Sequence, residues 1–285
     1  LRHLGEAYLR ERLPLIYDMA ETFMCLDPAK DPIPVRPGVH YTMGGVKVDG
    51  NCETSLPGLF AIGECASVGI HGANRLGSNS LTELLVFGKG AGDQAVKKAK
   101  SLPPGNSASL LKQAQAAEAR VMALKTKTGG TERIADIRKE MVKTMEDGCG
   151  IYRVEETMQA TCNKLGELRE RFKNISIDDK SSVWNTDWLM AVELDYQLDV
   201  AQSMAHSAVN RKESRGAHQR LDGPNEAYVQ RDDVNFLKHS EAYYAPGSAP
   251  RIAYGDVKIT KSQPAARVYG AAGEKADQER KESHV

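Results

Sequence analysis

Residues 36–92 constrain the fold of this chain most, because short glycine-rich turns alternate there with well-patterned elements. Successive blocks read RPGVHYTMGG, LFAIGE, HGANRLGSNS and LTELLVFGKGAG. Glycine allows positive backbone φ angles and lets a backbone approach a ligand closely. His40 and Arg75 lie in these turns. We therefore expect this stretch to wall a ligand site and the rest of the chain to support it.

The apolar run of residues 59–62 predicts a strand that ends at Gly63 and Glu64. A carboxylate just beyond a strand end can accept hydrogen bonds from sugar-type hydroxyls, as the acidic residue of a dinucleotide site does. This pattern makes Glu64 a candidate cofactor ligand. An ordinary turn with no ligand is the alternative.

Residues 80–83 read Ser-Leu-Thr-Glu, which matches a helix capping box, so the pattern predicts a helix that starts at Ser80. The free N–H groups and the partial positive charge of a helix N-terminus favour an anionic ligand group. A normally capped helix with nothing bound is the competing interpretation.

A dianionic substrate would suit the turns that carry His40 and Arg75. Arginine offers a planar fork to one carboxylate, and histidine supplies a donor or a positive charge to another. The chain has no Gly-x-Ser-x-Gly elbow, no HExxH and no P-loop, so simple hydrolase and NTPase functions have no support. The GxGxxG dinucleotide fingerprint is also missing from the sequence.

The overall composition excludes several classes of protein. The 38 basic and 38 acidic residues cancel, so no bulk charge indicates nucleic acid as a partner. No apolar run is long enough to span a bilayer. The five cysteines are scattered without a CxxC pair, which argues against structural zinc, an iron–sulfur cluster or a disulfide framework and favours a reducing compartment. The chain opens at Leu1 inside a helical pattern, so we expect it to be a fragment.

Outside this stretch the pattern is mostly helical. Apolar spacing predicts one helix over the first two dozen residues, followed by a proline-rich connector at 28–37 and a turn at Asp49 and Gly50. A linker at 103–109 precedes predicted helices at about 110–127, 132–146 (ended by Gly148), 154–172 and 187–211, which suggest a helical bundle. Two core stripes are expected: Leu110, Ala114, Ala117, Val121 and Leu124, and then Met158, Cys162, Leu165 and Leu168.

The last third of the chain is less regular. The basic segment 211–220 could hold a phosphate or a partner's carboxylates, and a solvated helix end is the alternative. Short strands are predicted at 252–254 and 257–259. Residues 273–285 are charged and nearly devoid of large apolar groups, so they are predicted to be a disordered tail.

Several blocks together resemble the flavoprotein subunits of the fumarate reductase and succinate dehydrogenase family. They are HYTMGG (40–45), GLFAIGEC (58–65), HGANRLGSNSL (71–81), RKESRGAH (211–218) and RDDVNFLKH (231–239). The resemblance covers essentially the whole chain. NCET (51–54), VNFLKH and DVKIT (256–260) look more like the reductase branch than the dehydrogenase branch.

The resemblance implies an FAD-dependent enzyme that reduces fumarate to succinate, with electrons from quinol delivered through an iron–sulfur subunit. By this likeness His40 and Arg75 would bind the substrate carboxylates, Glu64 would hold the FAD ribitol, and Ser80 and Leu81 would face the flavin pyrimidine. The family's proton-donating arginine matches no residue here, so no catalytic residue and no metal ligand is assigned. Membrane-anchor subunits would hold the protein at the cytoplasmic face of the bacterial inner membrane, as a peripheral component.

The same resemblance implies the fold class and the domains. It is an α/β plus α chain, the C-terminal half of such a subunit. Residues 1–35 would end a capping domain, 36–102 would form the C-terminal part of a Rossmann-like FAD-binding domain, 103–220 a helical bundle, and 221–285 a small mixed domain with a disordered tail.

The sequence leaves three other functions open. Two are neighbouring enzymes, a succinate dehydrogenase flavoprotein and L-aspartate oxidase. The third is a non-catalytic fragment or docking module, because the chain by itself lacks the segment that would cradle the FAD diphosphate.

Overall fold

The computed structural model describes residues 1–103, 105–261 and 263–265. The chain forms two units, Leu1–Gly44 and Gly45–Val285, and each is described by itself. The tail predicted to be disordered, residues 273–285, lies outside the described residues.

The first unit contains a short 3-10 helix η1 (Arg2–Leu4) and two helices, α1 (Glu6–Arg12) and α2 (Pro14–Met24). The single helix predicted here is wrong. The backbone breaks at Leu13, with φ −133° and ψ 46°, and Pro14 then occupies the first position of α2. Proline has no N–H and its ring clashes with the preceding turn, so it starts a helix more readily than it continues one. Residues 32–40 have no regular secondary structure, as their prolines predicted.

The second unit begins with a parallel pair of strands, β1 (Val46–Lys47) and β2 (Ala66–Ser67), in which Val46 lies opposite Ala66. The predicted turn at Asp49 is confirmed, because the Cys52 N–H donates to the Asp49 carbonyl at 3.0 Å. The strand predicted at 59–62 is wrong except for one antiparallel bridge between Phe60 and Glu53. The chain enters a 3-10 turn, η2 (Gly63–Cys65), instead of extending a sheet.

The long helix α3 (Asn79–Ser101) follows the glycine-bearing loop. The predicted capping box is wrong, because Ser78, not Ser80, is the N-cap and makes no capping hydrogen bond with its side chain. Glu83 turns into the protein instead, where it contacts His71. After a short linker, α4 (Ser107–Thr126) starts at Asn106, whose side chain accepts a hydrogen bond from the Ser109 N–H at 3.1 Å.

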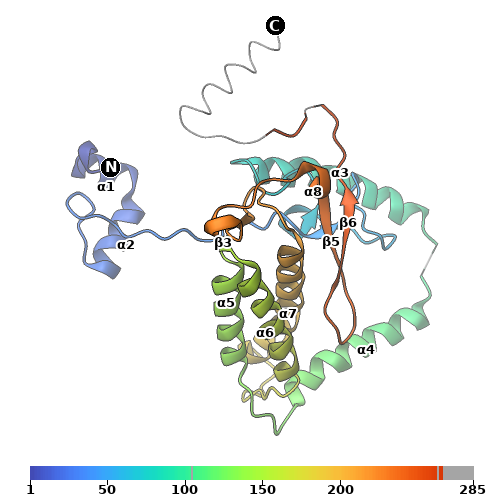
Figure 1. The fold of residues 1–285 in the computed structure, drawn as a ribbon. Helices are drawn as coiled ribbons and strands as arrows, with labels where there is room; N and C mark the ends of the chain where they lie inside the picture. The colour runs from blue at the N-terminus through green and yellow to red at the C-terminus, as the bar shows by residue number, and fades with distance from the viewer. Residues whose placement is uncertain (104, 262, 266–285) are drawn as a thin grey trace. The chain divides into compact units, whose positions relative to one another are not determined.

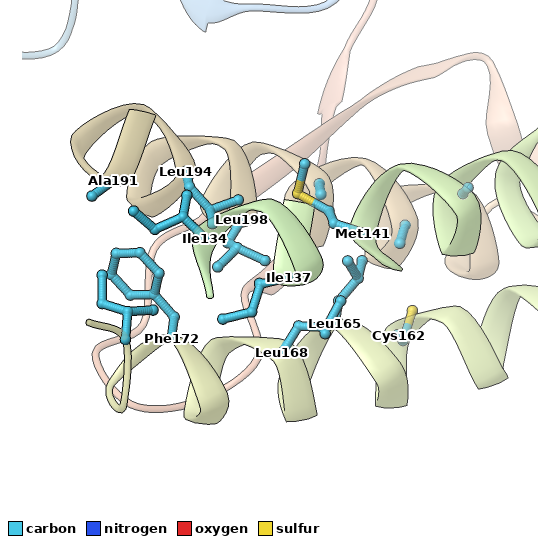
Figure 2. Close-up of a cluster of buried hydrophobic side chains, with 14 of the residues drawn as sticks. Ile134, Ile137, Met141, Cys162, Leu165, Leu168, Phe172, Ala191, Leu194 and Leu198 are labelled. Atoms are coloured by element: carbon cyan, nitrogen blue, oxygen red, sulfur yellow. The ribbon is translucent and has the colours of Figure 1, made fainter. Parts of the chain in front are cut away.

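The main core lies between three helices, α5 (Ile134–Cys149), α6 (Glu155–Phe172) and α7 (Thr186–Asn210), which lie side by side (Figure 1). Residues at helical spacing, such as Ile134, Ile137 and Met141 on α5, interdigitate with leucines of α6 and α7 (Figure 2). The predicted extents of the last two helices and the α6 stripe are confirmed. The prediction that Gly148 ends its helix is wrong, since α5 continues to Cys149.

The core stripe predicted on α4 is mostly wrong. Leu110 is 58% exposed, and only the end of the helix reaches the core, where Leu124 packs against it. The Trp188 indole N–H donates to the Val121 carbonyl at 2.9 Å and fixes this end to α7. The earlier turns of α4 lead away from α7 (Figure 1), so their apolar residues are not covered within the described chain.

The rest of the chain wraps around the end of α7. Strand β3 (Tyr152–Arg153) pairs in parallel with β4 (Gln219–Arg220), and η3 (Pro224–Glu226) and α8 (Asp233–Phe236) follow. Strands β5 (Lys238–Tyr243) and β6 (Arg251–Asp256) form an antiparallel pair. The strand predicted at 252–254 is confirmed within β6. The strand predicted at 257–259 is wrong, because β5 begins at Lys238, opposite Asp256, and offers no further partner.

Across the described ranges, no helix is long and apolar enough to cross a membrane.

Candidate functional site

The segment around η2 packs directly on helix α3, and Gly63 makes this possible. Its φ of +77° is in the left-handed region, and an added Cβ atom would lie 2.3 Å from Cδ2 of Leu84. Any other residue at this position would therefore meet backbone strain, and the end of the Leu84 side chain would have to move. The next residue, Glu64, is exposed. The structure thus places Glu64 in a 3-10 turn against the first turns of α3.

The N-terminus of α3 has the character of an anion site. Its N-cap, Ser78, has a φ of +63°, and the first turn carries no acidic side chain. The Leu81 N–H donates to the Ser78 carbonyl at 3.2 Å, which tightens this turn. The positive end of the helix dipole is therefore not neutralised by a carboxylate in the first turn. Ser80 and Leu81 both lie in this turn, as the sequence predicted, although the cap is two residues earlier.

Arg75 lies in the loop between β2 and α3 and is partly buried. Its Nη1 donates to the carbonyl of Leu76 at 3.1 Å. This bond to the neighbouring backbone directs part of the guanidinium toward its own loop. Arg75 therefore comes from the connection between η2 and the N-terminus of α3, the two elements that carry Glu64, Ser80 and Leu81.

A buried pair fixes the start of this loop to the helix. His71 Nε2 lies 2.5 Å from Glu83 Oε2, and only 8% and 2% of the two side chains are exposed. Sequence reasoning missed this pair, because it assigned Glu83 to a capping box. The signal that could have found it is an acidic residue on the apolar side of α3, where an uncompensated charge would be costly.

A cavity of about 310 Å³ lies between this loop and α3. Its walls combine apolar side chains with polar ones from both elements. They are Ile70, His71, Asn74, Leu76, Asn79, Thr82, Glu83, Val86 and Phe87. The first turn of α3 and the loop that carries Arg75 thus share a concave surface with polar and apolar lining.

His40 lies in the first unit, on an exposed stretch without regular structure, whereas Arg75 lies in the second unit. The two predicted carboxylate ligands therefore belong to separate units of this chain. Their joint role stays a prediction.

The basic segment 211–220 is an internal network of ion pairs, so neither predicted interpretation of it is right. Arg211 and Arg215 each contact the fully buried Glu213 at 2.7 Å, and Arg220 contacts Glu155 at 2.8 Å. The chain's own carboxylates neutralise these arginines. A phosphate or a partner's carboxylate would have to displace them.

His218 lies inside this network as a neutral side chain. Arg153 Nη1 lies 2.8 Å from its Nδ1, and its Nε2 lies 3.1 Å from the Arg211 carbonyl, so Nδ1 accepts and Nε2–H donates. Burial, reinforced by the neighbouring arginines, lowers the pKa of His218 to about 4. Among the described residues, no group of three or more histidine, cysteine, aspartate or glutamate side chains is arranged to hold a metal ion.

Two family models match the chain. A model described as "FAD binding domain" matches residues 1–81, and one described as "Fumarate reductase flavoprotein C-term" matches residues 138–269. The first match contains Glu64, Arg75, Ser80 and Leu81. The second contains helix α6 and the network around Glu213.

Curated relatives share more than half of their residues with this chain. Fumarate reductase flavoprotein subunits of a Serratia species and of Escherichia coli are 58% and 57% identical, over 98% and 97% of this chain. A succinate dehydrogenase flavoprotein subunit of Rickettsia felis is 38% identical over 94% of it. The chain spans about half the length of the relatives it matches, 46%, 45% and 47% respectively.

Solved structures of fumarate reductases also match the fold of this chain. A chain of E. coli quinol fumarate reductase superposes with a TM-score of 0.89 at 56% identity, covering 94% of this chain and 45% of that one. A quinol–fumarate reductase determined with menaquinol molecules gives a TM-score of 0.87 at 57% identity, over 93% and 45% of the two chains.

The matched FAD-binding domain, which contains η2 and the N-terminus of α3, places the chain in the class of FAD-binding proteins. The second family model, matched at residues 138–269, and the identity of the chain to its relatives narrow this class. The chain belongs to the fumarate reductase and succinate dehydrogenase flavoprotein family.

Proposed function

We propose that this chain forms one wall of the FAD and substrate site of a fumarate reductase flavoprotein subunit, which reduces fumarate to succinate. The observation that carries the proposal is the compact unit of residues 63–83. In it a glycine-dependent turn, an arginine-bearing loop and a helix N-terminus are joined by the buried pair of His71 and Glu83. The 57–58% identity to fumarate reductase flavoprotein subunits supports it.

The residues of this unit fit FAD. Glu64 would accept hydrogen bonds from the ribitol hydroxyls, and the helix N-terminus at Ser80 and Leu81 would lie at the flavin pyrimidine. A helix N-terminus stabilises the negative charge that a reduced flavin carries there, which tunes the cofactor's potential. When bound, FAD supplies the hydride for the reduction.

The substrate is a dianion, and two side chains would bind it. Arg75 offers a fork to one carboxylate and His40 a donor to the other. Holding both carboxylates polarises and twists the double bond toward a carbanion-like transition state, which lowers the barrier to hydride addition. No proton donor is assigned to this chain, so we infer that the proton comes from another part of the flavoprotein.

The domain organisation we propose follows the same family. Residues 1–35 end a capping domain and 36–102 form the C-terminal part of the Rossmann-like FAD-binding domain. A helical domain spans 103–220, and a small mixed domain spans 221–285. The buried core between α5, α6 and α7 supports the third of these, since it closes without residues from outside that range.

The reductase branch is favoured over the dehydrogenase branch and over L-aspartate oxidase. The fumarate reductase flavoproteins of a Serratia species and of Escherichia coli are 58% and 57% identical to this chain, whereas the succinate dehydrogenase flavoproteins of Rickettsia felis and Coxiella burnetii are 38% and 40% identical. We infer an iron–sulfur subunit and membrane-anchor subunits as partners and quinol as the electron source. We place the protein on the cytoplasmic face of the bacterial inner membrane.

The test is made on the full-length flavoprotein that contains this chain, reconstituted with FAD. We expect stoichiometric flavin binding and fumarate-dependent oxidation of a reduced dye, with succinate formed in equal amount. Co-purification with an iron–sulfur protein would exclude L-aspartate oxidase. Flavin binding without turnover of fumarate or succinate would contradict the proposal, and absence of flavin binding would favour a non-catalytic docking module.

A further inference from the structure

Residues 215–218 form a tight two-residue hairpin turn at the centre of the ion-pair network. The Arg215 N–H donates to the His218 carbonyl at 2.8 Å, and the His218 N–H donates back to the Arg215 carbonyl at 3.0 Å. Gly216 has a φ of +56°, which suits glycine at the first central position of such a turn. The turn is therefore fixed in shape by its own backbone.

This turn touches the loop that carries Arg75. The Ala217 N–H donates to the Ala73 carbonyl at 3.0 Å. A Cβ atom added at Gly216 would lie 2.5 Å from that carbonyl oxygen and 2.8 Å from the Ala73 Cβ. Ala73 is two residues before Arg75, so a side chain at position 216 would displace the backbone that carries the arginine.

The ion-pair network fixes the position of the turn. Glu213, with no exposed surface, accepts from Arg211 and from Arg215 at 2.7 Å each. Arg215 also contacts Asp233 at 2.6 Å. A buried ion-pair network of this kind is costly to break, because removal of one member leaves the others buried and unpaired. The turn is thus a rigid support, although it lies more than 130 residues from the loop in sequence.

We propose that the Gly216–Ala217 turn is the positioning element for Arg75. It fixes the loop at Ala73, while the pair of His71 and Glu83 fixes the same loop to α3. The inference rests on the proposed function, in which Arg75 binds a substrate carboxylate. The contact uses a backbone N–H of Ala217 and the missing side chain of Gly216, so Gly216 is the residue that cannot be replaced.

The test compares Gly216→Ala with Gly129→Ala in the full-length flavoprotein loaded with FAD. Gly129 also has a positive φ, +76°, but no atom lies within 4 Å of an added Cβ, so it controls for backbone strain alone. We expect Gly216→Ala to lower kcat/KM for fumarate on the order of 10- to 100-fold, mainly through KM, because the arginine is displaced. Gly129→Ala should stay within about twofold of the wild type, since its strain is remote from the site.

Hydrogen exchange gives a readout that does not depend on turnover. In the wild type, succinate should slow amide exchange in residues 70–76 and also in residues 215–218, because the two segments share a hydrogen bond. In Gly216→Ala the protection of 70–76 by succinate should be lost. If that variant does not fold, Arg215→Lys, which keeps the charge and loses the fork, should raise KM in the same direction.

Every outcome of these experiments supports or overturns either the proposed function or the positioning role of the turn. Wild-type turnover of fumarate tests the proposed function, and its absence overturns that function and this inference together. With an active wild type, an unchanged KM in Gly216→Ala, an equal loss in Gly129→Ala, or no protection of residues 215–218 by succinate would overturn the positioning role alone.

Discussion

Nε2 of His71 and Oε2 of Glu83 are 2.5 Å apart in a nearly solvent-free setting, and this contact joins the Arg75 loop to the second turn of α3. A partner removed from a buried pair leaves the other group unpaired, at a cost of about 3–5 kcal/mol. A contact between residues twelve positions apart therefore joins two elements of the candidate site.

Glu83→Ala should lower the free energy of unfolding by about 3 kcal/mol, because it removes the short contact that Glu83 makes with the buried His71 side chain. The control is Asp93→Ala on the same helix, whose contact with Lys89 at 3.4 Å is exposed and should be worth less than about 1 kcal/mol. Urea unfolding of the full-length protein measures both. Equal effects of the two substitutions would show that burial of the pair is unimportant.

Gly148→Ala and Gly166→Ala should change stability in opposite directions. At Gly148 an added Cβ would lie 1.9 Å from Thr161 Oγ1, so the close packing of α5 on α6 would be forced apart at a cost of about 2 kcal/mol. At Gly166 no atom lies within 4 Å, so alanine should stabilise helix α6 by about 0.5–1 kcal/mol. Thermal unfolding of both variants checks the sign. Stabilisation by Gly148→Ala would refute the packing argument.

Stability should fall as the pH is lowered from about 6.5 toward 4, because of His218. Its pKa is lowered from 6.5 to about 4 in the folded protein, so the unfolded chain binds a proton in this range and the folded protein does not. The stabilisation is complete above the unfolded pKa and decreases as the pH falls through the folded pKa, by up to about 3 kcal/mol.

His218→Gln should flatten this part of the profile. Glu140, whose pKa is lowered to about 2 by Arg171 and Lys164, acts only below its ordinary pKa of 4.5, so the two effects occupy largely separate pH ranges. Unfolding free energies measured at intervals from pH 7 to pH 4.5 separate them. A variant with the slope of the wild type would show that His218 does not titrate as inferred.

Arg75→Lys should reduce kcat/KM for fumarate on the order of 100- to 1,000-fold in the full-length flavoprotein. Lysine keeps the charge but loses the planar fork that matches a carboxylate. Arg138→Lys, on an exposed position of α5, is the matched control and should have no effect. Near-normal turnover by Arg75→Lys would remove Arg75 from the substrate site.

His40→Ala should raise KM for fumarate about 10-fold and leave kcat nearly unchanged, if the contact binds the substrate and the transition state equally. His3→Ala, an exposed histidine in the same unit, should leave both constants unchanged. Steady-state kinetics over a range of fumarate concentrations separates the two constants. A KM equal to that of the wild type would show that His40 makes no contact with the substrate.

Local patterns were enough to predict the helices α6 and α7 and the apolar stripe of α6, because helical spacing is a signal between near neighbours in the chain. The family blocks, similarly, identified the candidate residues Glu64, Arg75, Ser80 and Leu81 without any knowledge of their contacts. Local patterns failed where a distant partner changed the outcome. Glu83 fits a capping box in sequence, yet it is buried against His71, where it is worth more to the fold than as a cap.

The role of the basic segment depends on contacts in space. In sequence, Arg211, Arg215 and Arg220 are consistent with a phosphate site, because their acidic partners include Glu155 and Asp233, which lie far away along the chain. The same holds for Gly216, whose missing side chain has a purpose only beside Ala73. Charge pairing and close packing depend on distance in space, and a sequence records only distance along the chain.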